Sequence, residues 1–275
     1  MTSPEKFFDI NGMRMHYVDQ GEGVPVLMVH GNPTWSFFYR TIAEGLSKTH
    51  RVIVPDHIGM GLSDKPQDAD YRLSFHIDNI ERLVEHLGLK DIILIVHDWG
   101  GAIGFGYAVN HLENVAKIVV LNASAFFDPR IPRRIRLCRG ILGEFFVRRL
   151  NLFARAATLM TTVTRLPKQA RQGYLLPYGS YADRVGIYSF LKDIPTERGH
   201  RTRPLLDSIE SRLREVSADV LILWGKKDFC FSEHFLDRWK GFFPSAETRL
   251  YENAGHYILE DVPDEALREI QEFVR

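Results

Sequence analysis

Hydrophobic and polar residues follow two alternating patterns along the chain. Runs of β-branched and aliphatic residues are typical of buried strands, whereas apolar residues that recur every three or four positions are typical of helices. Eight strand-like runs lie near residues 7–10, 13–18, 26–29, 51–54, 92–98, 115–121, 220–224 and 248–251. The first two flank Asn11-Gly12, a strong hairpin signal, and most of the others alternate with helical stretches. This order predicts an α/β fold with a mostly parallel eight-stranded sheet and helices on both faces.

The alternation stops after the sixth strand. Residues 126–204 contain several short helical patterns, no clear strand, and many prolines and glycines that interrupt regular structure. Strands and helices resume with Val220–Trp224. We therefore expect a core domain made of residues 1–125 and 205–275, with residues 126–204 inserted as a helical cap, or lid, domain.

Charge is distributed unevenly between these two parts. The whole chain has a net charge of zero, so nothing in its overall charge favours binding to nucleic acid. Residues 126–204, in contrast, hold 14 Arg and 2 Lys against 3 Asp and 2 Glu, a net charge of +11. This excess is typical of a solvated basic surface. It also suits peripheral contact with an anionic membrane or with an acidic partner enzyme.

Cysteine content and hydropathy bear on where the protein works. The 275 residues include only two cysteines, Cys138 and Cys230, no apolar leader follows Met1, and no apolar run is long enough to cross a bilayer. We expect a cytoplasmic protein without a disulfide framework. No Cys/His cluster has metal-ligand spacing and no glycine-rich phosphate loop follows the first strand, so we expect neither a metal nor an organic cofactor.

The most informative stretch is the fifth strand and the turn after it. The apolar run Ile92–Val96 ends at His97 and Asp98, and Trp99-Gly100-Gly101 leads into an apolar helix. A strand, one reactive residue, a sharp turn and a helix form a nucleophile elbow, here with aspartate in place of serine. The free N–H groups of the helix favour an ionised carboxylate, which can attack carbon and form an ester. The alternative is that Asp98 only caps that helix, a common position for aspartate.

An aspartate nucleophile needs a base, and an acid that orients the base. His256 is the best candidate base, because it lies in a loop of small residues directly after the last strand, whereas His30 and His97 border the site and fit a supporting role. The orienting acid is expected after the sixth or the seventh strand. Only the seventh is followed by a carboxylate, Asp228, so Asp228 is the predicted acid.

Two further residues can hold negative charge. Asn32, in the loop after the third strand, offers a side-chain amide and Trp99 offers an indole N–H, and their backbone N–H groups can form an oxyanion hole. Tryptophan is often simple core packing, but the position directly after the nucleophile is poorly placed for that. The order Asp98, Asp228, His256 is the nucleophile–acid–base order of the α/β-hydrolase fold, which is therefore the predicted fold.

Two motifs in these loops resemble those of a known family. His30-Gly31-Asn32-Pro33-Thr34-Trp35 and Val96-His97-Asp98-Trp99-Gly100-Gly101 closely resemble motifs of the haloalkane dehalogenases, and the resemblance covers the whole chain. It implies that Asp98 displaces halide from carbon, that Asn32 and Trp99 hold the halide, and that water activated by His256 cleaves the resulting ester.

Five other segments resemble a narrower group, the β-lactone decarboxylases of bacterial long-chain olefin biosynthesis. These segments are Asp56–Pro66, Leu137–Arg139, Pro177–Ser180, Lys192–Pro195 and Phe231–Leu236. The resemblance implies a four-membered lactone with two long alkyl chains as substrate, and a cis-alkene and carbon dioxide as products. Asp98 would open the ring, at its carbonyl or its alkyl carbon, and Asn32 and Trp99 would hold the released oxyanion or carboxylate. Decarboxylation consumes no water, so His256 would have a different task from that in dehalogenation.

Four functions therefore stay open. We place β-lactone decarboxylase first and haloalkane dehalogenase second, and both take a small hydrophobic substrate. Epoxide hydrolase is third, because such enzymes use cap tyrosines to protonate the epoxide oxygen, although the Asn32 loop speaks against it. Four tyrosines are available in the cap, namely Tyr174, Tyr178, Tyr181 and Tyr188. The fourth function is a catalytically silent binding module, which predicts a missing triad residue, and none is missing.

Overall fold

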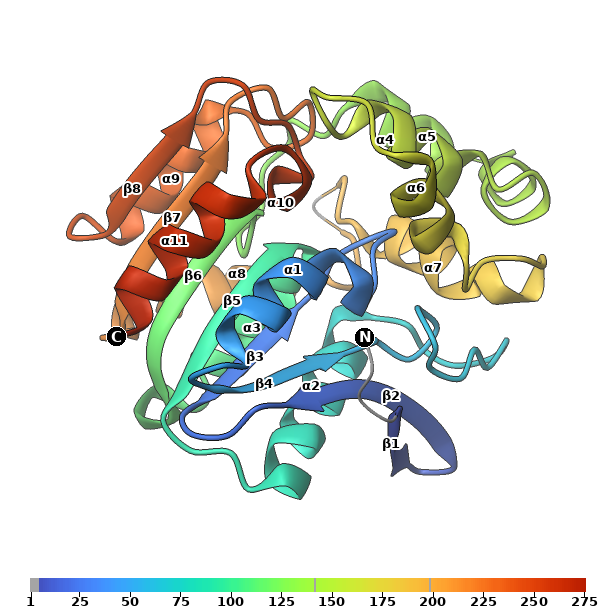
Figure 1. Ribbon diagram of the computed structural model, residues 1–275. Helices are drawn as coiled ribbons and strands as arrows, with labels where there is room; N and C mark the ends of the chain where they lie inside the picture. The colour runs from blue at the N-terminus through green and yellow to red at the C-terminus, as the bar shows by residue number, and fades with distance from the viewer. Residues whose placement is uncertain (1–4, 141, 198) are drawn as a thin grey trace.

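The computed structural model describes residues 5–140, 142–197 and 199–275. Its centre is an eight-stranded sheet in the order β1-β2-β4-β3-β5-β6-β7-β8 (Figure 1). The strands are β1 (Lys6–Ile10), β2 (Met13–Gln20), β3 (Pro25–Val29), β4 (Arg51–Pro55), β5 (Ile92–Asp98), β6 (Val115–Ala123), β7 (Asp219–Gly225) and β8 (Glu247–Tyr251). β1 and β2 form the predicted hairpin, β2 is antiparallel to β4, and the remaining neighbours are parallel. The predicted sheet is confirmed.

Helices cover both faces of this sheet. One face carries α1 (Arg40–Leu46) and α11 (Pro263–Val274), and the other carries α2 (Leu73–Leu87), α3 (Trp99–Ala108), α8 (Arg203–Arg212) and α9 (Glu233–Phe242). Short elements complete this part: η1 (Ser36–Tyr39), η2 (Leu112–Asn114), η5 (Leu213–Glu215) and α10 (Ile258–Asp261). Along β5, Leu94 and Val96 face one hydrophobic core and Ile93 and Ile95 the other. Both faces of the central strands are buried, which explains their continuous apolar sequence.

The segment between β6 and α8 is built from helices. They are α4 (Arg133–Arg139), the π-helical turn η3 (Phe145–Arg149), α5 (Leu152–Met160), α6 (Lys168–Leu175), η4 (Ala182–Arg184) and α7 (Val185–Asp193). Figure 1 shows these helices together beyond the carboxyl ends of the central strands. We call residues 126–204 the helical segment. Its predicted end at residue 204 falls within the first turn of α8, whose Leu206 and Ile209 pack in the core.

Polar contacts join the helical segment to the rest of the molecule. The guanidinium of Arg40 in α1 binds the carboxylate of Glu260 in α10, at 2.5 and 2.9 Å, and the hydroxyl of Tyr174 in α6 donates to the same carboxylate. The indole N–H of Trp35 donates to the carbonyl of Gly173 at 3.2 Å. The bonds of Tyr174 and Gly173 fix α6 against α10 and against the loop that follows β3.

Within the described ranges, no helix is both long enough and apolar enough to cross a bilayer.

Candidate active site

Asp98 lies at the turn between β5 and α3. Its backbone has φ +54° and ψ −125°, a conformation that residues other than glycine rarely adopt and that presents the side chain at the top of the sheet. Two glycines make room for this turn. A Cβ atom on Gly31 would overlap the Asp98 carboxylate, and one on Gly100 would overlap the carbonyl oxygen of Val29. The glycines of the two sequence motifs are therefore required by close approach.

The Asp98 carboxylate is held from two sides. Its Oδ1 accepts the backbone N–H of Asn32 at 2.8 Å, and its Oδ2 lies 3.5 Å from Nε2 of His256. It makes no capping hydrogen bond to α3, so the alternative in which Asp98 serves only as an N-cap has no support in its contacts. Burial by itself would raise the pKa of this carboxyl, but the bond and charge of His256, with the Asn32 N–H, bring the pKa below its usual value. Asp98 is thus an anion at neutral pH.

His256 connects Asp98 to Asp228. Its Nδ1 lies 2.8 Å from Oδ2 of Asp228, and all three side chains are buried. Burial alone would lower the pKa of His256, but the charges and hydrogen bonds of the two carboxylates raise it to about 10. The structure therefore brings the predicted nucleophile, base and acid together in one chain of contacts, with an imidazolium between two carboxylates.

Asn122 holds Asp228 in place, a contact that the sequence did not indicate. It follows the sixth strand's apolar run, at one of the two places where an orienting acid is expected. Its Nδ2 donates to Oδ2 of Asp228 at 3.0 Å and to the carbonyl of Gly225, and its Oδ1 accepts the Gly225 N–H. Backbone N–H groups of Cys230 and Phe231 bind the other oxygen, Oδ1 of Asp228. The only sign of this role in the sequence is a polar residue, Asn122, directly after the apolar run of the sixth strand.

His30 and His97 lie behind the site. Nε2 of His97 donates to the carbonyl oxygen of His256 at 2.9 Å, and burial lowers the pKa of His97 to about 3, so this ring is neutral. Nδ1 of His30 donates to the carbonyl of Gly31 at 2.8 Å. Both rings fix the backbone of loops that carry the site, in agreement with the supporting position expected for them.

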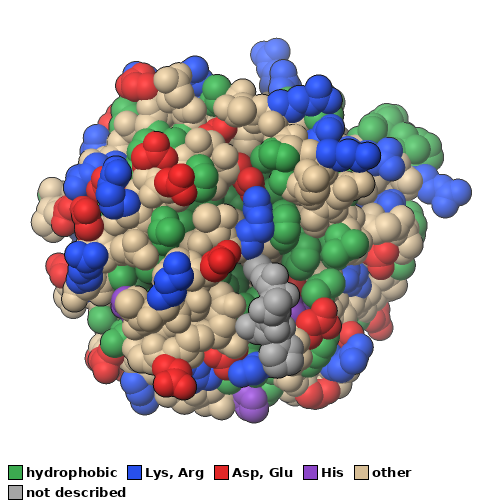
Figure 2. All heavy atoms as spheres, viewed as in Figure 1, with side chains coloured by type: hydrophobic (Ala, Val, Ile, Leu, Met, Phe, Trp, Pro, Cys, Tyr) green, Lys and Arg blue, Asp and Glu red, His purple; other side chains and the backbone are tan. Residues whose placement is uncertain are grey.

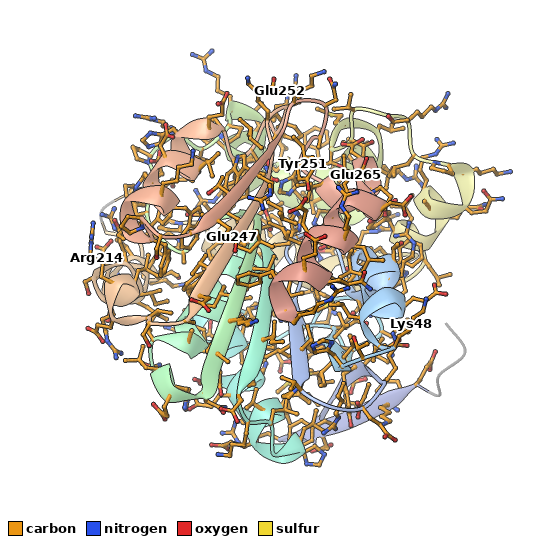
Figure 3. The ribbon with its side chains drawn as sticks, turned by 60° about the vertical axis from the view of Figure 1, so that its left-hand side comes forward. Lys48, Arg214, Glu247, Tyr251, Glu252 and Glu265 are labelled. Atoms are coloured by element: carbon orange, nitrogen blue, oxygen red, sulfur yellow. The ribbon has the colours of Figure 1, made fainter. Side chains whose placement is uncertain are left out.

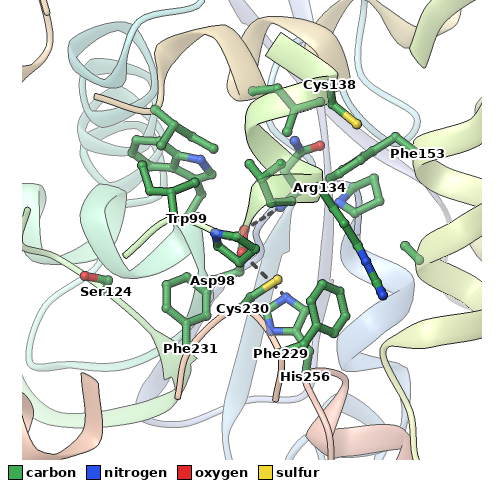
Figure 4. A pocket seen from close by; sticks show the side chains of 18 of the residues that line it. Asp98, Trp99, Ser124, Arg134, Cys138, Phe153, Phe229, Cys230, Phe231 and His256 are labelled. Carbon is green, nitrogen blue, oxygen red and sulfur yellow. Dashed lines mark hydrogen bonds and ion pairs between the residues drawn. The ribbon is translucent and has the colours of Figure 1, made fainter. Parts of the chain in front are cut away.

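Asn32 and Trp99 lie on the wall next to Asp98. The amide nitrogen of Asn32 donates one hydrogen to the carbonyl of Ile187 in α7 at 3.1 Å, which leaves its second N–H for a ligand. Trp99 is half-buried and meets Phe190 edge to face, with ring centroids 6.3 Å apart. In Figure 4, Trp99 and His256 lie on opposite sides of the Asp98 carboxylate.

These residues form one end of a large cavity (Figure 4). Its volume is about 890 Å³, within the range of ligand pockets, and the rest of its wall is mainly apolar. The helical segment supplies much of that wall, including Ile135, Leu142, Phe146, Leu152, Phe153 and Met160. Arg130, Arg134, Cys138 and Cys230 also line the cavity, which the sequence did not indicate. Among the described residues, no cluster of three or more His, Cys, Asp or Glu has a metal-binding arrangement.

The four tyrosines of the helical segment do not line this cavity in the described structure. Tyr178 is fully buried, and its hydroxyl donates to the carbonyl of Thr34, while the hydroxyl of Tyr174 donates to Glu260. Tyr181 is turned to Glu144. Among the residues that the structure describes, the cavity wall therefore lacks the pair of cap tyrosines expected for an epoxide hydrolase.

Comparisons with known proteins agree with this geometry. A family model described as the alpha/beta hydrolase fold matches residues 24–263. The chain is 43% identical to a cis-3-alkyl-4-alkyloxetan-2-one decarboxylase of Shewanella oneidensis, over 98% of this chain and 87% of that protein. It is 32% identical to haloalkane dehalogenase 2 of Mycobacterium bovis, over 94% and 91% of the two chains.

A solved structure has the same fold. It is the haloalkane dehalogenase DatA from Agrobacterium tumefaciens, with a TM-score of 0.89 and 23% sequence identity. The match covers 98% of this chain and 95% of that one.

Proposed function

This chain belongs to the α/β-hydrolase family, in the group that holds cis-3-alkyl-4-alkyloxetan-2-one decarboxylases and haloalkane dehalogenases, and we propose that it is a decarboxylase of cis-3,4-dialkyl oxetan-2-ones. One observation carries the proposal. A buried aspartate, paired with a histidine, lies at the end of an apolar cavity of about 890 Å³. Such a site suits a substrate with one small electrophilic ring and large apolar arms, as a dialkyl β-lactone has.

The first step is ring opening by Asp98. The Asp98 carboxylate attacks the alkyl-substituted ring carbon next to the ring oxygen, the bond between that carbon and the ring oxygen breaks, and the ring oxygen leaves as part of a free carboxylate. The product of this step is an ester between Asp98 and the alkyl chain. The relief of strain in the four-membered ring drives the step, and the ionised state of Asp98, supported by its lowered pKa, supplies the nucleophile.

The second step removes carbon dioxide. The bond between the chain and its new carboxylate breaks, its electron pair forms the carbon–carbon double bond, and Asp98 leaves again as a carboxylate. Displacement with inversion followed by anti elimination converts a cis-lactone into a cis-alkene. No water is consumed and no proton is gained or lost.

The surrounding residues stabilise the charges that these steps create. Asn32 and Trp99 hold the released carboxylate in the position where a dehalogenase holds halide. The imidazolium of His256, which bonds Asp228 through its other ring nitrogen, stabilises the negative charge that returns to Asp98 as it leaves. Asp228 orients the ring. His256 is thus a source of positive charge rather than a base in this reaction.

The other parts of the chain fit this function. Residues 126–204 act as a cap domain that encloses the alkyl chains, over a core formed by residues 1–125 and 205–275. The protein works in the cytoplasm, a location supported by its free thiols at Cys138 and Cys230. Its basic helical segment meets a membrane surface or a partner enzyme that supplies the substrate.

Haloalkane dehalogenase is the second candidate, because the same five residues can perform it and a dehalogenase is among the relatives. In that reaction His256 must lose its proton to activate water. Ester formation removes the negative charge of Asp98, which lowers the pKa of His256 toward the range in which it can act as a base.

A paired assay on one preparation of the protein tests these functions. One arm offers a cis-dialkyl β-lactone and follows the alkene by gas chromatography, and the other offers 1-bromo- and 1-iodoalkanes and follows halide release. We expect fast alkene formation and slow or absent halide release. Fast halide release with an inert lactone would establish the dehalogenase, and inactivity in both arms would overturn both proposals.

A further inference from the structure

Large hydrophobic side chains on the surface are concentrated in the helical segment. In the described part of the chain, 15 of them are exposed, and 11 of these lie within residues 126–204. Six fall between α4 and the start of α5: Leu137, Leu142, Phe145, Phe146, Leu150 and Leu152. Leu137 is 75% exposed and Leu142 is 64% exposed. A concentration of exposed apolar side chains of this kind marks a contact surface.

Positive charge is concentrated in the same stretch. Residues 130–160 contain eight arginines and a single acidic residue, Glu144. Glu144 binds the buried Arg148 at 3.0 Å, so this carboxylate is already paired with an arginine of the same segment. Arg133, Arg136, Arg149 and Arg155 are exposed, and no ion pair involves them among the residues that the structure describes. Figure 2 shows hydrophobic and basic side chains side by side at the upper right, where Figure 1 places the helical segment.

The cavity of the active site opens at this surface. Leu137, Leu142, Phe146 and Leu152 are exposed to solvent and also line the cavity, as does the exposed Arg134. A side chain can do both only at an opening. We call the exposed residues of 130–160 the entrance surface. An apolar molecule that enters the cavity therefore passes an apolar rim with a basic border.

We propose that the entrance surface binds the surface of an anionic lipid bilayer, so that a long-chain substrate passes from the acyl region into the cavity without crossing water. This inference rests on the proposed function for the nature of the substrate. The lipid surface itself is indicated by the combination of exposed leucines and phenylalanines with arginines, which is the composition of interfacial helices. Arginine stems can extend along the apolar region while their guanidinium groups reach lipid phosphates.

Charge argues against a second copy of this chain as the occupant. A two-fold dimer would place two entrance surfaces together, each with the positive charge of its arginines, and these would repel. An acidic partner enzyme would match the charge. Lipid is favoured over such a partner because exposed leucines and phenylalanines lie among the arginines, the mixture that interfacial lipid binding uses, and absence of vesicle binding would favour the partner instead.

Vesicle binding tests the proposal on the full chain. Vesicles of phosphatidylcholine alone are compared with vesicles that also contain phosphatidylglycerol, by flotation at moderate salt, with the free protein checked for oligomers by size exclusion. We expect binding only to the anionic vesicles and release at high salt. Absence of binding to anionic vesicles would overturn the proposal, whether the protein is monomeric or forms a dimer.

Two double variants with matched controls locate the surface. Arg133→Glu with Arg136→Glu removes basic charge next to Leu137, and neither residue lines the cavity. We expect this change to weaken binding to anionic vesicles by about tenfold or more, the order expected when two lipid-facing arginines are replaced by acids. The control is Lys48→Glu with Lys240→Glu, which makes the same change in net charge on the core. Equal loss of binding in both variants would show that the protein's total charge, rather than this surface, is responsible.

The apolar part is tested in the same way. Phe145→Ser with Leu150→Ser should weaken vesicle binding several-fold and leave the salt dependence of binding unchanged. The control is Val24→Ser with Leu250→Ser, which changes exposed apolar residues outside the helical segment and should leave binding unchanged. Unchanged binding in the first pair would exclude insertion of this turn.

Activity separates this inference from the proposed function. Turnover of a short-chain lactone that dissolves in water requires the active site alone. If the wild-type protein does not turn over this lactone, the proposed function is wrong. Turnover of a long-chain lactone held in anionic vesicles requires the entrance surface as well. We expect Arg133→Glu with Arg136→Glu to reduce the second rate about tenfold and leave the first unchanged. Equal rates on vesicle-held substrate would overturn the route from lipid.

Discussion

The two walls of the cavity are built in different ways. The wall formed by the strand-end loops carries buried polar groups whose hydrogen bonds are made within the loops, as in the contacts of Asp98, His256 and Asp228. The wall formed by the helical segment is apolar and reaches the solvent, as at Leu137 and Leu142. The first wall can fix charges and reacting atoms in place, which catalysis requires. The second can only exclude water, accept chains of a certain size and open to an apolar source.

The outer surfaces of the two regions differ as well. The edge of the core at β8 and α11 carries Glu247, Glu252 and Glu265, which Figure 3 labels on the same face as Lys48 and Arg214, and Lys226 and Arg249 pair with two of these acids. The helical segment carries the excess of arginine. The opposite charges cancel in the whole chain, so the net charge of zero hides a strongly polarised molecule. Such a charge distribution orients the molecule relative to an anionic surface.

The largest expected effect comes from removing the nucleophile from the wall formed by the strand-end loops while the wall formed by the helical segment stays intact. Asp98→Asn should reduce turnover of the preferred substrate by at least about 10³-fold, because an amide cannot displace the ring oxygen or halide. Binding of the substrate should remain, since the apolar wall is unchanged. The measurement is single-turnover product formation beside a binding titration with a substrate analogue.

Freshly prepared Asp98→Asn protein should be checked by mass, because deamidation would restore the aspartate. Asp78→Asn, on α2 away from the cavity, is a matched control that should keep full activity. Substantial turnover by verified Asp98→Asn would show that Asp98 is not the nucleophile.

The charge of His256, in the wall formed by the strand-end loops, makes the free energy of unfolding depend on pH. The folded pKa of His256 is raised to about 10, above the ordinary value of 6.5, so the protonated ring stabilises the fold most fully below pH 6.5. This stabilisation is lost as the pH rises from 6.5 through 10. The shift corresponds to a loss on the order of 5 kcal/mol in the free energy of unfolding, since one pKa unit corresponds to about 1.4 kcal/mol.

Denaturant titrations at pH 6 and pH 10 on wild type and His256→Gln measure this term. The glutamine variant should lose less free energy of unfolding between the two pH values than wild type does. His86→Gln, on the surface of α2, is the comparison for an exposed histidine. An identical pH dependence in wild type and His256→Gln would contradict the assignment of an imidazolium between two carboxylates.

Asn122 tests how far catalysis depends on the hydrogen bonds within the strand-end loops. Asn122→Ala removes two donated hydrogen bonds and one accepted bond around Asp228 and Gly225. We expect kcat to fall about 10- to 100-fold with KM little changed, because the orienting acid becomes less well fixed. The free energy of unfolding should fall by about 1 to 3 kcal/mol, since buried polar groups lose their partners.

Asn79→Ala tests whether this effect is specific. Asn79 is also buried, but its amide nitrogen has no hydrogen-bond partner among the described residues, and it lies on α2. It should change kcat by less than twofold or so, given the absence of a link to the site. A fall in kcat in Asn79→Ala as large as in Asn122→Ala would indicate a general loss of stability.

The same contrast explains what the sequence could predict. Strands buried on both faces leave continuous apolar runs, and reactive residues follow those runs at fixed chain positions, so the sheet and the placement of Asp98, Asp228 and His256 were predictable. Asn122 was missed because its role depends on a contact between two loops, which no local pattern records. The roles assigned to the five site residues stay predictions.

In the helical segment, amphipathic spacing indicated helices but not their packing, because short helices between prolines can pack in several ways. From sequence alone, any of the four tyrosines could have protonated an epoxide oxygen. In the described structure none of them lines the cavity, and three of them bond Glu260, Thr34 and Glu144 instead. The cavity positions of Arg134 and Cys138 were likewise invisible, since both depend on how α4 is turned.

The smallest expected effect concerns the size of the helical wall. On α5, Phe153, Ala156, Ala157 and Met160 line the cavity at helical spacing, so Ala156→Phe inserts a ring into the space proposed for an alkyl chain. We expect kcat/KM to fall about tenfold for long-chain lactones and to change little for short-chain ones, because a difference of a few methylenes in an apolar pocket has effects of this size. Ala182→Phe, exposed on η4 and outside the cavity, is the control. An equal fall in kcat/KM for every chain length would mean that the new ring disturbs the strand-end loops. The wall at α5 would then affect the reaction itself and not only the chain length that the cavity accepts.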